Sequence, residues 1–138
     1  MTPETLAACH ARAFAGQGRA WQAAEFKALL DSPHVFAAGC ARGFAIGRVI
    51  ADEAELLTLA TDPDHRRAGL ARAALAAFET EARARGATRG FLEVAEDNAA
   101  ARALYAAAQW RECARRAAYY SRTAGPAADA LVLEKPLG

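Results

Sequence analysis

The chain has 138 residues, a length typical of one domain with one hydrophobic core. Its 54% hydrophobic and 24% charged residues are typical of a globular protein and exclude wholesale disorder. The formal net charge of +1 gives no overall field that would attract nucleic acid or an anionic membrane, so any anion site must be local.

Three cysteines and three histidines are scattered along the chain without CxxC pairs or metal-ligand spacing. We therefore expect neither a disulfide framework nor a metal. The first 20 residues lack a basic start followed by a long apolar run, and no apolar stretch approaches the roughly 20 residues of a membrane span. These features predict a soluble, cytoplasmic protein, one domain over residues 1–138, with no nucleic acid or membrane partner. The oligomeric state stays open between a monomer and a weak dimer.

The first half predicts two helices followed by three strands. Thr2 and Pro3 resemble a helix start, and the second helix covers residues 21–30, ended by Pro33. Strands follow at three places: residues 35–38, 43–50 and 54–60. The first two strands are joined by residues 39–42, which predict a hairpin.

The second half alternates helices and strands. Residues 70–85 form a strongly periodic helix, and Gly86 is a typical stop signal. A strand at residues 91–94, a helix at 98–108, and strands at 111–120 and 129–135 complete the chain. The order predicts an α/β (α+β) fold with a mixed central sheet flanked by helices.

A basic turn leads from the third strand into the long helix. Arg66 and Arg67 precede Gly69, and the helix begins directly after this glycine. The free N–H groups and the positive dipole end of a helix favour an anion, and a glycine lets a ligand approach the backbone. An ordinary strand-to-helix turn with solvated arginines is the alternative. The chain lacks GxxxxGK[ST], which excludes a P-loop.

Two further side chains could carry acid–base chemistry. Glu93 lies in an otherwise apolar strand, where a carboxylate needs either a wet cleft or a partner such as an arginine. Tyr105 shares one helix face with Asn98 and Ala101, and its ring could equally belong to the core. Asn98 is also the expected N-cap of that helix.

The turn at residues 66–71, Arg-Arg-Ala-Gly-Leu-Ala, resembles the R/Q-x-x-G-x-G/A signature of the GNAT superfamily of N-acetyltransferases. The resemblance implies the GNAT acyl-CoA N-acyltransferase fold and acetyl-CoA as co-substrate. The turn would hold the pyrophosphate, the end of the third strand would bind pantetheine through its backbone, and the sheet would splay to admit it. The cofactor-binding residues implied are Leu59, Ala60, Thr61, Arg67, Ala68, Gly69, Leu70, Ala71, Arg72 and Asn98.

The segments 92–94, 98–105 and 116–120 resemble the RimI-like branch of ribosomal protein alanine N-acetyltransferases. That resemblance implies a protein N-terminal peptide as substrate, possibly of a ribosomal protein, with Glu93 as general base through water and Tyr105 as the acid that protonates the sulfur. Tyr119 and Tyr120 would meet the peptide. Adjacent strand residues point to opposite faces, so we expect at most one of these tyrosines to line the groove.

An α-amine, with a reference pKa near 7.8 against about 10.4 for lysine, is the easier acceptor for a weak base. A small-molecule amine as acceptor, or a non-catalytic acetyl-CoA-binding regulator, are the alternatives. The chain departs from the family at Gln109 and Trp110, where relatives have Gly then Phe. Either Gln109 takes the left-handed turn at a cost of about 1 kcal/mol, or the helix ends differently.

Overall fold

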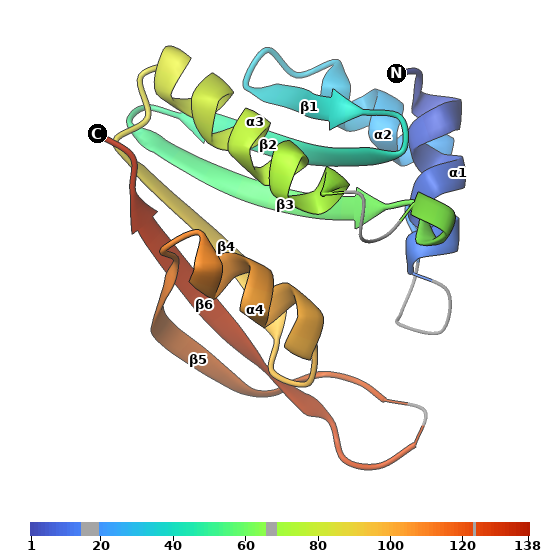
Figure 1. The fold of residues 1–138 in the computed structure, drawn as a ribbon, viewed down its shortest axis with the longest axis vertical. Coiled ribbons are helices and arrows are strands. Elements are labelled where there is room, and N and C mark those ends of the chain that lie inside the picture. Colours follow the sequence, from blue (N-terminus) through green and yellow to red (C-terminus); the bar gives the residue numbers. More distant parts are fainter. Residues whose placement is uncertain (15–19, 66–68, 123) are drawn as a thin grey trace.

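The computed structural model describes residues 1–14, 20–65, 69–122 and 124–138. Its centre is a six-stranded mixed sheet in the order β1-β2-β3-β4-β6-β5 (Figure 1). The strands are β1 (Val35–Cys40), β2 (Gly43–Ile50), β3 (Glu53–Thr61), β4 (Arg89–Ala95), β5 (Arg111–Tyr120) and β6 (Ala128–Pro136). The helices are α1 (Pro3–Ala13), α2 (Ala23–Leu30), the 3-10 turn η1 (Pro63–His65), α3 (Leu70–Ala84) and α4 (Ala99–Ala107). The predicted α/β fold is confirmed.

Helices cover both faces of the sheet, which divides the buried residues into two clusters. Neighbouring residues of β2 show the division: Ala45 belongs to the cluster with Leu75 and Phe78 of α3, whereas Phe44 belongs to the cluster with Phe26 of α2. Successive side chains of a strand point to opposite faces, and here both faces are packed. In consequence β2 is almost continuously apolar and buried.

The helix boundaries follow from their caps. The Thr2 side chain accepts a hydrogen bond from the Thr5 backbone N–H at 3.1 Å and so begins α1. The second helix begins at Ala23, two residues later than predicted, because Gln22 is its N-cap and donates its backbone N–H to Glu25 at 3.1 Å. The Trp21 backbone N–H instead donates to Nδ1 of the buried His10 at 3.1 Å. Within the described ranges, no helix is long and apolar enough to cross a membrane.

Candidate active site

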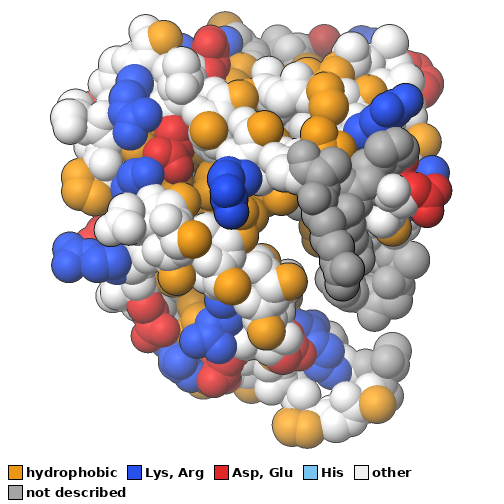
Figure 2. All heavy atoms as spheres, viewed as in Figure 1, with side chains coloured by type: hydrophobic (Ala, Val, Ile, Leu, Met, Phe, Trp, Pro, Cys, Tyr) orange, Lys and Arg blue, Asp and Glu red, His pale blue; other side chains and the backbone are white. Residues whose placement is uncertain are grey.

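The sheet opens between its two parallel strands. The β3–β4 ladder joins residues 53–56 only to residues 89–92. Beyond it, β3 continues along β2 to Thr61, while β4 continues along β6 to Ala95. Figure 1 shows the two strands diverging, and the space-filling view of the same face shows an opening between the two parts of the molecule (Figure 2). The predicted splay of the sheet is therefore confirmed.

The end of β3 lies on one side of this opening. Leu59, Ala60 and Thr61 are all in the part of β3 that has no ladder to β4. Where a strand has no neighbour on one side, its backbone N–H and C=O groups on that side are free to bind an extended chain, which then lies beside the strand like an added strand. The structure thus brings these three predicted residues to an edge suited to an extended ligand.

Helix α3 begins close by with an uncapped N-terminus. Gly69 is its N-cap in the left-handed conformation, with φ of 75°, and as a glycine it supplies no side-chain cap. The Ala73 backbone N–H donates to the Gly69 carbonyl at 3.0 Å. A Cβ built on Gly69 meets nothing within 4 Å, so the approach to the amides of Leu70, Ala71 and Arg72 is open among the described atoms. The predicted ligands Arg67 and Ala68, with Arg66, lie outside the described residues.

The turn before α3 is fastened to the rest of the protein by residues that the sequence did not point to. The Asp62 backbone N–H donates to the Arg42 carbonyl at 2.7 Å, and the Asp64 N–H donates to the Asp62 carboxylate at 3.0 Å. Arg12 of α1 forms ion pairs with both Asp62 and Asp64. The hydrogen bond to Asp64 is the main reason that the pKa of the Arg12 guanidinium is raised. These contacts link α1 and the β1–β2 turn to the segment that leads into α3.

Glu93 lies in β4, opposite Val132 of β6. Its neighbours Leu92 and Val94 are buried in the cluster under α3 and α4, so the Glu93 side chain points to the other face of the sheet. The side chain is 29% exposed, and its Oε1 lies 3.3 Å from Nη2 of Arg116 in β5. Glu93 therefore has both features weighed from the sequence: it reaches solvent and it is paired with an arginine.

Tyr105 lies in α4 on the opposite side of β4 and is only 6% exposed. Its ring packs edge-on against Trp110, with centroids 6.3 Å apart. Burial raises the pKa of the Tyr105 hydroxyl, which keeps the group protonated. Among the described residues, nothing forms a hydrogen bond with this hydroxyl, although buried tyrosines normally find a partner. Asn98 is the N-cap of α4, as predicted, and accepts a hydrogen bond from the Ala101 N–H at 3.2 Å.

The two tyrosines of β5 contact each other, so the prediction that they point to opposite faces is wrong. Their ring centroids are 5.2 Å apart in an edge-on arrangement. The reason is a break in the β5–β6 register between Arg116 and Tyr120, where Ala118 has a φ of 50°. Tyr119 is 51% exposed, whereas Tyr120 is half-buried. Burial, and then the charge of Glu93, raise the pKa of Tyr120.

The departure at Gln109 and Trp110 is accommodated by a buried polar network. Gln109 keeps the left-handed turn, with φ of 74°, at a cost of about 1 kcal/mol. Trp110 donates its Nε1–H to Oε2 of Glu79 in α3 at 3.1 Å, and Lys135 of β6 lies 2.6 Å from Oε1 of the same carboxylate. Gly90 leaves room for the indole, because a Cβ there would lie 2.8 Å from it. The network joins α3 to the segment that follows α4.

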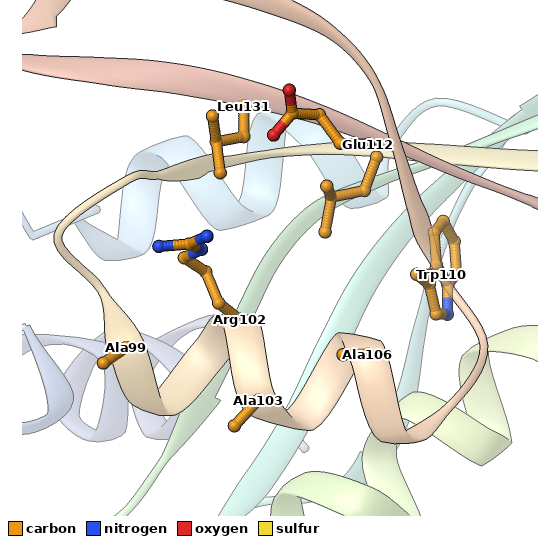
Figure 3. A pocket seen from close by; sticks show the side chains of 8 residues that line it. Ala99, Arg102, Ala103, Ala106, Trp110, Glu112 and Leu131 are labelled. Atoms are coloured by element: carbon orange, nitrogen blue, oxygen red, sulfur yellow. The ribbon is translucent and has the colours of Figure 1, made fainter.

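A cavity of about 370 Å³ lies on a different face of α4 from Tyr105. Arg102 of α4 and Leu131 of β6 point toward each other across it (Figure 3). None of the residues expected from the sequence to bind a ligand lines this cavity. The part of the chain that the structure describes also contains no group of His, Cys, Asp and Glu residues able to hold a metal ion.

The splayed mixed sheet, with an uncapped, glycine-led helix at its opening, defines a GNAT-type acyl-CoA N-acyltransferase fold. Residues 6–109 match the acetyltransferase (GNAT) family, and the chain belongs to that family.

The chain is similar to ribosomal protein bS18-alanine N-acetyltransferases of bacteria. It is 43% identical to the protein of Escherichia coli strain K12 over 94 residues, which are 68% of this chain and 63% of the relative. The Haemophilus ducreyi protein of the same name is 33% identical over 90 residues, 65% of this chain and 62% of the relative. The matched region thus spans less than two thirds of these curated relatives. The crystal structure of the ribosomal-protein-S18-alanine N-acetyltransferase from Escherichia coli has a TM-score of 0.84 at 31% identity, covering 99% of this chain and 88% of that one.

Proposed function

We propose that the chain is an acetyl-CoA-dependent N-acetyltransferase, acting as one domain, whose acceptor is the N-terminal alanine of a ribosomal protein or a similar protein N-terminus. The observation that carries the proposal is the opening between β3 and β4, which leads to the uncapped start of α3. An extended thiol arm fits the first feature, and a pyrophosphate fits the second. The names of the similar bacterial proteins support the choice of acceptor.

Acetyl-CoA would lie with its pantetheine along Leu59, Ala60 and Thr61. The amides of residues 69–72, with Arg67 and Ala68 of the same turn, would hold its pyrophosphate, and Asn98 would contact the arm from the start of α4. The thioester would then lie within the opening of the sheet. Glu93 and Tyr105 would approach it from opposite faces of the sheet, because Glu93 points away from the face on which Tyr105 packs with Leu92 and Val94 of β4.

The acceptor nitrogen would attack the thioester carbonyl carbon and form the new C–N bond. Glu93, through a water molecule, would take the proton that the nitrogen loses. As the C–S bond breaks, the Tyr105 hydroxyl would give its proton to the leaving sulfur. A neutral, buried phenol with no hydrogen-bond partner in the described part of the chain suits this role, because the developing thiolate would supply an acceptor. Tyr119 and Tyr120 would contact the peptide, and Tyr119 lies beside Arg116, the ion-pair partner of Glu93.

Mass spectrometry of acetyl-CoA-dependent products tests this proposal. An alanine-starting peptide should gain one acetyl group at its α-amine, and a panel of polyamines, aminoglycosides and free amino acids should be acetylated far more slowly. Faster acetylation of a free amine would replace the peptide acceptor with a small molecule. Binding of acetyl-CoA with no turnover on any amine would instead indicate a regulator.

A further inference from the structure

Arg116 forms an ion pair with Glu93, the carboxylate that would act as base in the proposed reaction. Its Nη2 lies 3.3 Å from Oε1 of Glu93, and the Arg116 side chain is 57% exposed. Its guanidinium also stacks over the Tyr119 ring, 5.3 Å from the centroid. These contacts hold a cation against Glu93.

The break in β5 fixes this arrangement. The left-handed Ala118 donates its backbone N–H to Oδ1 of Asp129 at 2.8 Å, and Arg115 donates to the same carboxylate at 3.0 Å. These two contacts are the main reason that the pKa of Asp129 is lowered. Asp129 therefore holds the chain on both sides of Arg116, whose own side chain pairs with Glu93.

We propose that Arg116 is a displaceable counter-ion of Glu93 and a specificity-determining residue, so that only an acceptor that brings its own positive charge reaches the carboxylate. This inference rests on the proposed function. An α-amine with a reference pKa near 7.8 arrives mostly as an ammonium at neutral pH. The ammonium can exchange with the guanidinium at Glu93 without leaving a bare carboxylate, whereas a hydroxyl or an amide cannot.

The exchange is feasible because the ion pair is weak. Pairs between groups as exposed as Arg116 and Glu93 contribute little, since water screens both charges. The guanidinium could keep its cation–π contact with Tyr119 after it is displaced from Glu93. Arg116 therefore competes with the acceptor, and removing it should make the acceptor bind more tightly.

Steady-state kinetics of the Arg116→Ala variant with an alanine-starting peptide and saturating acetyl-CoA tests the role. The acceptor KM should fall by about two- to fivefold, the range that a pair of this exposure allows. General damage to the site would raise the KM, so the direction of the change separates the two explanations. The Arg116→Lys variant keeps the charge and should stay nearer to the wild-type KM.

Arg122 offers a matched control in the segment that follows β5. It also pairs with a carboxylate, Asp97, at 2.7 Å, and also lies over a tyrosine, Tyr120, at 5.6 Å. Arg122→Ala should not lower the acceptor KM. In a Glu93→Gln background, Arg116→Ala should no longer change the affinity for the peptide, measured calorimetrically with bound coenzyme A.

Two results separate the inference from the proposed function. If the wild type acetylates the peptide but Arg116→Ala leaves the acceptor KM unchanged or raises it, the counter-ion role is overturned and the proposed function stands. If the wild type acetylates no amine, the proposed function itself fails, and the role of Arg116 fails with it.

Discussion

The Tyr105→Phe substitution separates a catalytic hydroxyl from a core ring. The hydroxyl is buried and has no hydrogen-bond partner among the described residues, and a buried unsatisfied polar group costs about 1–3 kcal/mol. Phenylalanine keeps the ring that packs on Trp110 and removes this cost. The variant should therefore be at least as stable as the wild type, with a melting temperature unchanged or raised by up to about 10 °C.

Activity should move in the other direction. A positioned acid contributes about 10²- to 10⁴-fold to proton transfer, so kcat should fall within that range while acetyl-CoA affinity changes little. Release of coenzyme A thiol measures the rate, and calorimetry measures both the affinity and the melting temperature. Trp110→Phe is the matched control. It keeps an aromatic ring but removes the donor to Glu79, and should therefore lower the free energy of unfolding by about 1–3 kcal/mol.

The pH dependence of stability gives a second test of the same residue. Burial raises the pKa of Tyr105 in the folded protein, whereas the unfolded chain ionises near pH 10. Stability should be complete below pH 10 and fall above it, by up to about 1.4 kcal/mol between pH 10 and 11. Urea unfolding of Tyr105→Phe should show a shallower fall of stability above pH 10.

A Tyr105→Phe variant that keeps more than a tenth of the wild-type kcat, or that loses several kcal/mol of stability, would refute the role of Tyr105 as a catalytic acid with an unpaired hydroxyl.

Three further outcomes are expected. Glu93→Gln should slow turnover at least tenfold while leaving the calorimetric affinity for coenzyme A nearly intact, and a large loss of affinity would contradict its role as base. Gly69→Val should abolish stabilisation by acetyl-CoA in a melting assay, whereas Gly86→Val, at the other end of α3 with a φ that is also positive (92° against 75°) and an equally open Cβ position, should keep it. Glu79→Leu should lower the free energy of unfolding measured in urea by about 3–5 kcal/mol because it leaves the partly buried Lys135 without its carboxylate, and adding Lys135→Met should recover part of that loss. Equal stability of the single and double variants would argue against that pair.

Local patterns along the chain were sufficient for most of the secondary structure. The period of apolar residues in α3 and its Gly86 stop gave its ends to within one residue, because a helix and its caps are set by neighbours three or four positions apart. The strand at Glu93 was predicted too short, since its outer residues Arg89 and Ala95 are recognisable only by their pairing with β6. The two tyrosines were placed wrongly because the bulge at Ala118 depends on Asp129, eleven positions away.

The start of α3 and the buried network around Glu79 show the same difference between local patterns and long-range contacts. By itself, the sequence determined the glycine at the start of α3, because backbone conformation at such a position is a local property, but it left two outcomes open at Gln109, of which the structure has the left-handed one. It could not reveal that Glu79 receives Trp110 and Lys135, which lie 31 and 56 positions away, or that Arg116 faces Glu93. Only the tertiary structure decides which charges meet, because their distance depends on how the sheet is ordered and where its strands part.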